Sequence, residues 1–297
     1  MSDKLTNNPQ IDNLLKKIDV PKNTETTGHD WDGISEYDVP TPRWWLIVWI
    51  ICIIWSFIYW IFYPAWPTPG GNSKGILNWS GRSQLIASQV EIDTKQSTQL
   101  EKISHLDLRA IQKDPKLMEF ALNAGRVAFK ENCAACHGSG AQGAKGFPNL
   151  NDDDWLWGGK IEDIYQTLKF GIRSGHEKTR SNQMPSFGLD KVLKKDEIEA
   201  VAEYVMSLSG NASYNKKGDE IFKANCVACH GFGGKGNRAL GAPNLSDKIW
   251  LYGGKKEDII FTIYYARNGV MPYWSDRLSD NTIKELALYI HSLGGGE

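Results

Sequence analysis

The sequence predicts an all-α protein in which one N-terminal transmembrane helix is followed by two tandem copies of one helical domain. Residues 44–63 form an uncharged, apolar run. The hexapeptide CAACHG at residues 133–138 returns as CVACHG at residues 226–231. The regions around both hexapeptides lack the strict alternation of apolar and polar residues that is typical of a half-buried strand.

The first 43 residues are polar and contain three prolines, so we expect residues 1–43 to form a mostly irregular tail. The net charge of the chain is -1 and no block of basic residues is present, which argues against nucleic acid as a partner. Four of the five cysteines belong to the two CxxCH units, and Cys52 lies alone in the apolar run. A disulfide scaffold is therefore not expected.

Residues 44–63, WWLIVWIICIIWSFIYWIFY, are predicted to span a membrane, because twenty helical residues cover about 30 Å, the thickness of the hydrocarbon core. A cleaved signal peptide is the weaker interpretation, since a long polar segment precedes the run and PAWPTPGG, which follows it, offers no small-residue cleavage pattern. Aromatic side chains at mid-depth suit contact either with other transmembrane helices or with lipid. Arg43, Lys74 and Arg82 flank the run without a bias that would set its orientation.

Residues 64–113 are expected to connect the anchor to the repeated part. Prolines and glycines after Pro64 interrupt the chain, and residues 80–112 carry a loose helical pattern. Asp114 and Pro115 have the order of an N-cap residue and a proline in the first helical position, which predicts a helix running toward Asn132.

The remainder consists of two copies, predicted at residues 114–210 and 211–297. Gly125, Phe129 and the CxxCH unit recur 93 residues later, and the segment PNLNDDDWLWGGKIEDI recurs 95 residues later as PNLSDKIWLYGGKKEDI. The pair Met184-Pro185 recurs only 87 residues later as Met271-Pro272, so the first copy contains an inserted loop, HEKTRSNQ, at residues 176–183. The role of this loop stays open.

Each copy is predicted to begin and end with helices that cross closely. Gly125 and Gly218 lie in the first helices, and Tyr204 and Tyr289 occupy matching positions in the terminal helices. Because glycine allows two helix backbones to approach, we expect each glycine to meet the tyrosine of its own copy.

The CxxCH units have three interpretations. A zinc site would need both cysteine pairs together, which leaves the histidine after each pair unexplained. A redox dithiol would be expected after a strand in a βαβ unit, and no such pattern is present. Two cysteines on one helical turn can instead form thioethers with a porphyrin edge, and the next residue then reaches the iron. This predicts two covalently bound c-type haems, on Cys133, Cys136, Cys226 and Cys229, with His137 and His230 as axial ligands.

Each iron needs a sixth ligand if it only transfers electrons. Met184 and Met271 are the predicted ligands, because they alone among the methionines occupy matching positions and proline follows each. Three histidines and two internal methionines lack a counterpart and are better explained as ordinary helix or surface residues: Met118, Met206, His105, His176 and His291. Whether each methionine serves the haem of its own copy or of the other copy stays open.

Further residues are candidates for the surroundings of the haems. Pro148 and Pro243 would offer a carbonyl to the axial histidines. Matching aromatic and arginine residues would line the haems or pair with their propionates, or else be core aromatics and surface arginines: Trp155, Trp157, Trp250, Tyr252, Arg173 and Arg267.

Both copies resemble class I cytochrome c domains. The segment GHDWDGISEYDVPTPRWWLIVW from Gly28, the single anchor and the segment LNWSGRSQL from Leu77 resemble the membrane-anchored dihaem subunit of cbb3-type cytochrome c oxidase, the CcoP or FixP family. The resemblance covers nearly everything from Gly28 onward, while the first 27 residues and the inserted loop carry little of it.

This resemblance implies an electron-transfer subunit, not catalytic by itself, of a haem-copper terminal oxidase in a bacterial cytoplasmic (inner) membrane. It would take electrons from a soluble cytochrome c or another donor. It would pass them to a monohaem cytochrome c subunit and then to the catalytic subunit, which reduces oxygen to water and pumps protons. A small single-helix subunit is a further implied partner. The tail would be cytoplasmic and the haem domains periplasmic.

Two other functions share part of this chemistry. A free-standing, membrane-anchored dihaem shuttle would use the same haems without an oxidase. A dihaem peroxidase would need one iron with an open position, whereas both copies retain Met-Pro.

Overall fold

The computed structural model describes residues 25–295, which divide near Glu91 into two compact units. In the first unit, β1 (Thr26–Trp31) and β2 (Ile34–Tyr37) form an antiparallel hairpin. Asp32 and Gly33, between the strands, both have positive φ, as a tight hairpin turn requires. The expectation of an irregular tail is therefore wrong for residues 26–37, where an Asp-Gly turn signal was overlooked. Residues 1–24 lie outside the described part.

Helix α2 (Arg43–Phe62) matches the predicted membrane span and is the one helix of the described residues long and apolar enough to cross a bilayer. None of its residues is buried by the chain itself. It ends at Tyr63 and Pro64, and a short antiparallel pair follows, β3 (Pro67–Thr68) and β4 (Gly71–Asn72). Apolar side chains exposed along its whole length fit a helix that is covered by lipid or by other membrane helices.

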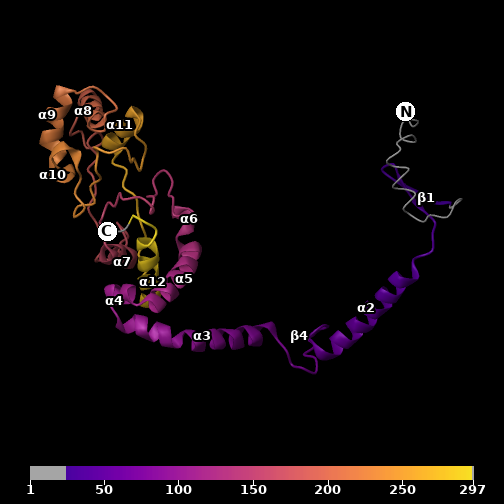
Figure 1. The fold of residues 1–297 in the computed structure, drawn as a ribbon. Coiled ribbons are helices and arrows are strands. Elements are labelled where there is room, and N and C mark those ends of the chain that lie inside the picture. Colours follow the sequence, from indigo (N-terminus) through magenta and orange to yellow (C-terminus); the bar gives the residue numbers. More distant parts are fainter. Residues whose placement is uncertain (1–24, 296–297) are drawn as a thin grey trace. The chain divides into compact units, whose positions relative to one another are not determined.

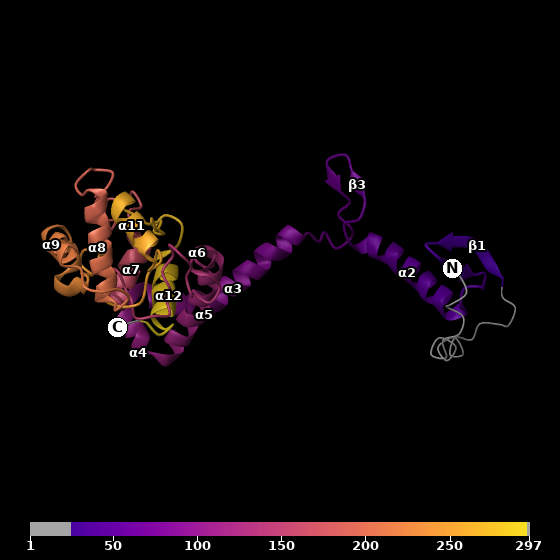
Figure 2. The same cartoon turned by 90° about the horizontal axis from the view of Figure 1, so that it is seen from above.

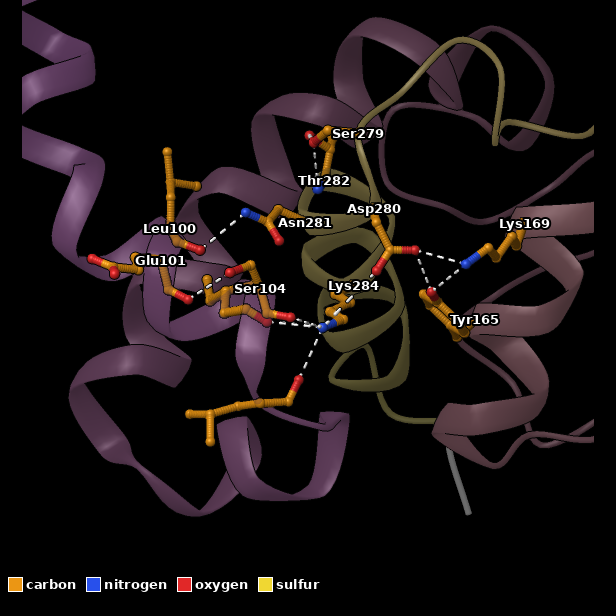
Figure 3. Close-up of polar contacts among 12 residues, drawn as sticks. Leu100, Glu101, Ser104, Tyr165, Lys169, Ser279, Asp280, Asn281, Thr282 and Lys284 are labelled. Atoms are coloured by element: carbon orange, nitrogen blue, oxygen red, sulfur yellow. Dashed lines mark hydrogen bonds and ion pairs between the residues drawn. The ribbon is translucent and has the colours of Figure 1, made fainter.

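The connector is more regular than its sequence pattern indicated. Helix α3 (Gly81–His105) is continuous over 25 residues, and α4 (Leu108–Lys113) follows it. The C-terminal end of α3 is fixed by α12 (Asp280–His291). The Lys284 ammonium donates to the carbonyls of Ile103, Ser104 and Leu106, and Asn281 donates to the carbonyl of Leu100 (Figure 3). The carbonyls of Ile103 and Ser104 belong to the last turn of α3, where carbonyls have no partner within the helix.

The other helices of the second unit include α6 and α10, which contain all but the first cysteine of the two CxxCH segments. Asp114 caps α5, as predicted, by accepting from the backbone N–H groups of Lys116 and Leu117. The bounds are α5 (Pro115–Asn132), α6 (Ala134–His137), α7 (Ile161–Phe170), α8 (Lys195–Leu208), α9 (Lys216–Asn225), α10 (Val227–His230), the 3-10 turn η1 (Phe232–Gly234) and α11 (Lys256–Tyr265).

The terminal helices of the two copies are exchanged. Helix α12 packs against α5 and α7, and α8 packs against α9 and α11 (Figures 1 and 2). A Cβ added to Gly125 would lie 2.8 Å from Cβ of Tyr289, and one added to Gly218 would lie 2.7 Å from Cβ of Tyr204. The predicted glycine crossings are thus present, but the expectation that each joins helices of one copy is wrong.

Two apolar cores result from this exchange. The first core contains buried residues from Ile103 to Leu168 together with Ile283 to Ile290, and the second contains buried residues from Phe187 to Ile263. In the sequence, the segment that forms the second core therefore lies between the two segments that form the first core. The chain leaves the first core after Ile172 and returns at Met271, and these two residues exchange two backbone hydrogen bonds of 3.0 Å.

The loop lengths explain why this pairing is favourable. Only residues 209–215 separate α8 from α9, so these helices can pack as sequence neighbours at a small cost in loop-closure entropy. Pairing α8 with α5 would require contact across more than 60 residues. The exchange also keeps a glycine–tyrosine contact at each helix crossing, because both copies have a glycine and a tyrosine at matching positions.

Candidate functional site

Each CxxCH unit forms one tight helical turn directly after a longer helix. Helix α5 ends at Cys133, and the backbone N–H groups of Cys136 and His137 donate to its carbonyl at 3.1 and 3.0 Å. Cys226 accepts from Cys229 and His230 in the same way, at 3.2 and 2.9 Å. The turn thus holds two thiols and an imidazole in one short segment in each copy.

Both histidine rings have a defined partner on one side. Nδ1 of His137 lies 3.0 Å from the carbonyl oxygen of Pro148, and Nδ1 of His230 lies 3.0 Å from that of Pro243. A carbonyl can only accept, so each Nδ1 carries the proton and each Nε2 keeps its lone pair for a metal. Burial lowers the pKa of both rings, which favours the neutral, ligating form.

The cysteines do not have the properties of a redox dithiol. Burial raises the pKa of the Cys133 and Cys226 thiols to about 11, and the second cysteine of each pair adds to the rise. A reactive dithiol requires a lowered thiol pKa. In residues 25–295, no three side chains of His, Cys, Asp or Glu gather as a metal site, and the two cysteine pairs lie in different cores. The zinc interpretation therefore lacks support as well.

The two predicted methionines lie in the cores opposite to their copies. Met271 packs against the first core, which includes Cys133, and Met184 packs against the second core, as Cys226 does. The backbone N–H of Met184 donates to the Asn268 side chain at 3.3 Å, and the same side chain donates back to the Met184 carbonyl. The backbone of Met184 is thereby held on both sides by one side chain.

Three family models together match most of the chain. They are the N-terminal domain of cytochrome oxidase-cbb3, FixP, at residues 23–69, cytochrome c at residues 122–209, and cytochrome c oxidase, cbb3-type, subunit III, at residues 214–290.

Curated relatives match over nearly their whole length. The FixP subunit of Bradyrhizobium diazoefficiens is 50% identical over 285 residues, covering 95% of this chain and 98% of that protein. The CcoP subunits of Azospirillum brasilense and Cereibacter sphaeroides are each 46% identical, covering 95% and 93% of this chain and 99% and 97% of those proteins. The chain belongs to the FixP/CcoP family of cbb3-type cytochrome c oxidase subunits. The predicted resemblance and the predicted pair of cytochrome c domains are confirmed.

Membership of this family makes the chain an electron-transfer subunit within an oxidoreductase complex, and cytochrome c domains imply covalently bound haem c. The side chains of this FixP/CcoP member fit that cofactor. Nε of Arg180 and Nε1 of Trp250 are buried donors that have no partner among the described residues. Haem carries two propionates, which are acceptors of the kind that such donors require.

An arginine that the sequence comparison overlooked takes the place expected of Arg173. The Arg180 guanidinium lies 5.2 Å from the Trp157 ring and donates to the Asp163 carbonyl. Arg267 repeats this arrangement in the other copy, 4.9 Å from the Tyr252 ring and donating to the Asp258 carbonyl. Sequence alignment had matched Arg267 with Arg173, but the inserted loop supplies its own arginine. The one arginine of that loop, seven residues after Arg173, was the available signal.

Arg173 instead lies where the chain passes between the cores. Its guanidinium donates to the carbonyls of Gly269 and Asn182, both at 2.7 Å. The Trp155 indole donates to the carbonyl of Gly295, near the end of the described chain. His176, in the inserted loop, lies between the rings of Phe170 and Tyr273 and is part of an aromatic cluster.

The loops that follow the two CxxCH units meet each other. The N–H of Gly146 donates to the carbonyl of Leu251, and Lys145 pairs with Asp258 at 2.7 Å. A Cβ on Gly146 would touch the Tyr252 ring, and one on Gly241 would touch the Trp157 ring. The two candidate sites therefore share a reciprocal contact made of glycines and aromatic rings.

Proposed function

We propose that the chain relays electrons through two covalently bound c-type haems, from a cytochrome c donor toward the catalytic subunit of a cbb3-type haem-copper oxidase. One observation carries the proposal. Both CxxCH turns present an imidazole whose Nδ1 is held by a proline carbonyl, so that Nε2 is free to bind iron. A subunit of this kind has no catalytic residue of its own.

The residues have distinct roles in this proposal. Cys133, Cys136, Cys226 and Cys229 form the thioethers, and His137 and His230 are the first axial ligands. Met184 and Met271 are the second ligands, which favour the reduced iron. The bound haem supplies one-electron chemistry. The protein fixes its orientation and surrounds it with apolar side chains that exclude water.

The buried donors would hold the propionates. Arg180 and Arg267 lie on matching aromatic rings, and Trp250 has an unpartnered indole N–H. Placing a guanidinium beside each haem would raise its potential, because a nearby cation disfavours the more positive ferric form. Arg173 is not given this role, because its guanidinium donates to the carbonyls of Gly269 and Asn182 where the chain passes between the cores.

The partners and the topology follow from the family. We expect a catalytic haem-copper subunit, a monohaem cytochrome c subunit and a small single-helix subunit, with a soluble cytochrome c or another protein as the donor. The tail would be cytoplasmic, α2 would span the inner membrane and the second unit would be periplasmic. The exposed, apolar side chains of α2, none of them buried by the chain itself, support contact with lipid and with other membrane helices. Proton pumping would belong to the catalytic subunit.

Purification of the tagged chain from its native membrane tests this function. We expect co-purification of b-type haem and copper, two c-type haems per chain, and oxygen consumption with a reduced cytochrome c. A preparation that contains the chain and its c-type haems alone would favour the free-standing shuttle. Peroxide-dependent turnover by the isolated chain would favour the peroxidase. A chain without covalent haem would contradict the proposal as a whole.

A further inference from the structure

We infer that the hairpin of β1 and β2 docks on a basic cytoplasmic loop of the membrane-spanning catalytic subunit. Its two exposed apolar side chains, Trp31 and Ile34, lie at the centre of the contact, and its carboxylates face lysine and arginine side chains of that loop. The inference rests on the proposed function, which puts the tail in the cytoplasm, and it adds a contact outside the membrane.

The hairpin has no core of its own. The two strands pair with each other, yet every residue from Glu25 to Pro42 is exposed. An isolated two-stranded hairpin is at best marginally stable in water. The surface that stabilises this hairpin therefore lies outside the part of the chain that the structure describes.

Two large apolar side chains lie side by side on the uncovered hairpin. Trp31 and Ile34 are directly opposite one another across the strands, with 68% and 73% of their surfaces exposed. Opposed residues of an antiparallel pair project from the same face of the sheet. Tryptophan is enriched at the centres of protein interfaces. This pair is therefore suited to anchor a partner protein.

The turn next to this pair is ordered by its own hydrogen bonds. Gly33 has a positive φ, and its N–H donates to the Asp30 carboxylate at 2.8 Å. The Ser35 hydroxyl donates to the same carboxylate, and the Trp31 indole donates to the Glu36 carboxylate, both at 3.4 Å. Because these bonds favour the paired conformation before docking, less conformational entropy is lost when a partner binds.

The hairpin is strongly acidic, which selects between possible partners. Between Glu25 and Val39 there are no lysines or arginines, and there are five carboxylates: Glu25, Asp30, Asp32, Glu36 and Asp38. Cytoplasmic loops of membrane proteins have an excess of lysine and arginine, which complements this charge. The anionic lipids of the cytoplasmic leaflet would repel it. The charge therefore favours a protein loop over lipid headgroups.

The link to α2 keeps the hairpin near the membrane surface. Only residues 38–42 separate β2 from α2, so Tyr37 and Arg43 lie at most about 20 Å apart. Pro40 and Pro42 further restrict the backbone of this link. The loops of a membrane-spanning subunit lie at the same surface. The catalytic subunit of the proposed oxidase is therefore within reach of the hairpin.

Carbodiimide cross-linking of the purified oxidase tests the contact. The reagent joins a carboxylate directly to a lysine amine, so it reports carboxylates and amines that touch. After digestion and mass spectrometry, we expect amide links between residues 25–39 and lysines in one cytoplasmic loop of the catalytic subunit. The yield of these links should fall as the ionic strength rises, because salt screens exposed charges.

Two substitutions that keep the turn residues test the apolar and acidic parts separately. Ile34→Ser and Glu36→Lys should each raise the rate at which the chain dissociates from the immobilised catalytic subunit in detergent, by about tenfold for the lost isoleucine. The covalent haem content of the chain should stay unchanged. Val127→Ser and Glu119→Lys, at exposed positions of α5, are the matched controls and should leave the dissociation rate unchanged.

Three results would overturn the inference while the chain still co-purifies with the oxidase. Links confined to lysines of residues 1–24 would show that the hairpin is covered by its own chain. Adducts with the amine of phosphatidylethanolamine, in place of protein links, would show that it lies on lipid headgroups. Unchanged dissociation rates for both variants would show that it contributes nothing to assembly. A chain that co-purifies with no oxidase would contradict the proposed function and this inference together.

Discussion

Glu285→Gln is expected to make the second unit more stable, and increasingly so as the pH rises. Glu285 lies on α12 with 4% of its surface exposed, and its Oε1 has no hydrogen-bond partner. Burial raises the pKa of its carboxyl from 4.5 to about 7. The residue at the matching position of α8 is Ala200, so the exchanged core does not need a carboxyl there.

The magnitude follows from the two pKa values. The difference corresponds to about 3 kcal/mol, at about 1.4 kcal/mol for each pKa unit. Above pH 4.5 the unfolded chain loses this proton, while the folded chain keeps it until about pH 7. Stability therefore falls as the pH rises through this window, and the whole penalty is present above pH 7.

Guanidinium unfolding of the full chain in mild detergent, followed by circular dichroism, measures the effect. The difference in free energy of unfolding between Glu285→Gln and the parent should grow by about 2 to 3 kcal/mol between pH 5 and pH 8. Glu199→Gln, at an exposed position on α8, is the control. A difference that is constant with pH, or that grows toward acid, would refute the reasoning.

Three further substitutions test contacts on which the fold and the proposed sites depend. Gly125→Ala should lower the stability of the second unit by about 1 to 3 kcal/mol, measured by chemical unfolding, because the added methyl meets the backbone of α12; unchanged stability would contradict the exchanged crossing. Lys284→Met removes three hydrogen bonds to the end of α3 and should cost about 1 to 3 kcal/mol. Amide exchange near that end should accelerate, whereas Lys217→Met, at an exposed pair, should leave it unchanged. Arg180→Gln should lower the reduction potential of the haem at the first CxxCH unit by an amount on the order of tens of millivolts, because a cation is removed. An equal effect from Arg173→Gln would contradict the assignment of Arg180 to this haem.

The sequence by itself determined the features that depend on local chemistry. A CxxCH turn needs only five consecutive residues, so both thiol pairs and both histidines were predictable, and the anchor followed from length and composition. The proline carbonyls were also predictable, because Pro148 and Pro243 follow their histidines by only 11 and 13 residues.

The tertiary structure decided which parts of the two copies pack together. Either glycine can pack against either tyrosine, because the repeat makes the two competing pairs of helices chemically alike. The residue types at the crossings therefore do not indicate which pairs form. The choice depends on chain connectivity, since the short link after α8 favours contact with α9. Arg180 and Glu285 were missed for a related reason. Arg180 lies in the inserted loop, where the other copy has no aligned residue, and Glu285 aligns with Ala200. Only the packed structure shows that Arg180 lies on the Trp157 ring and that Glu285 is buried.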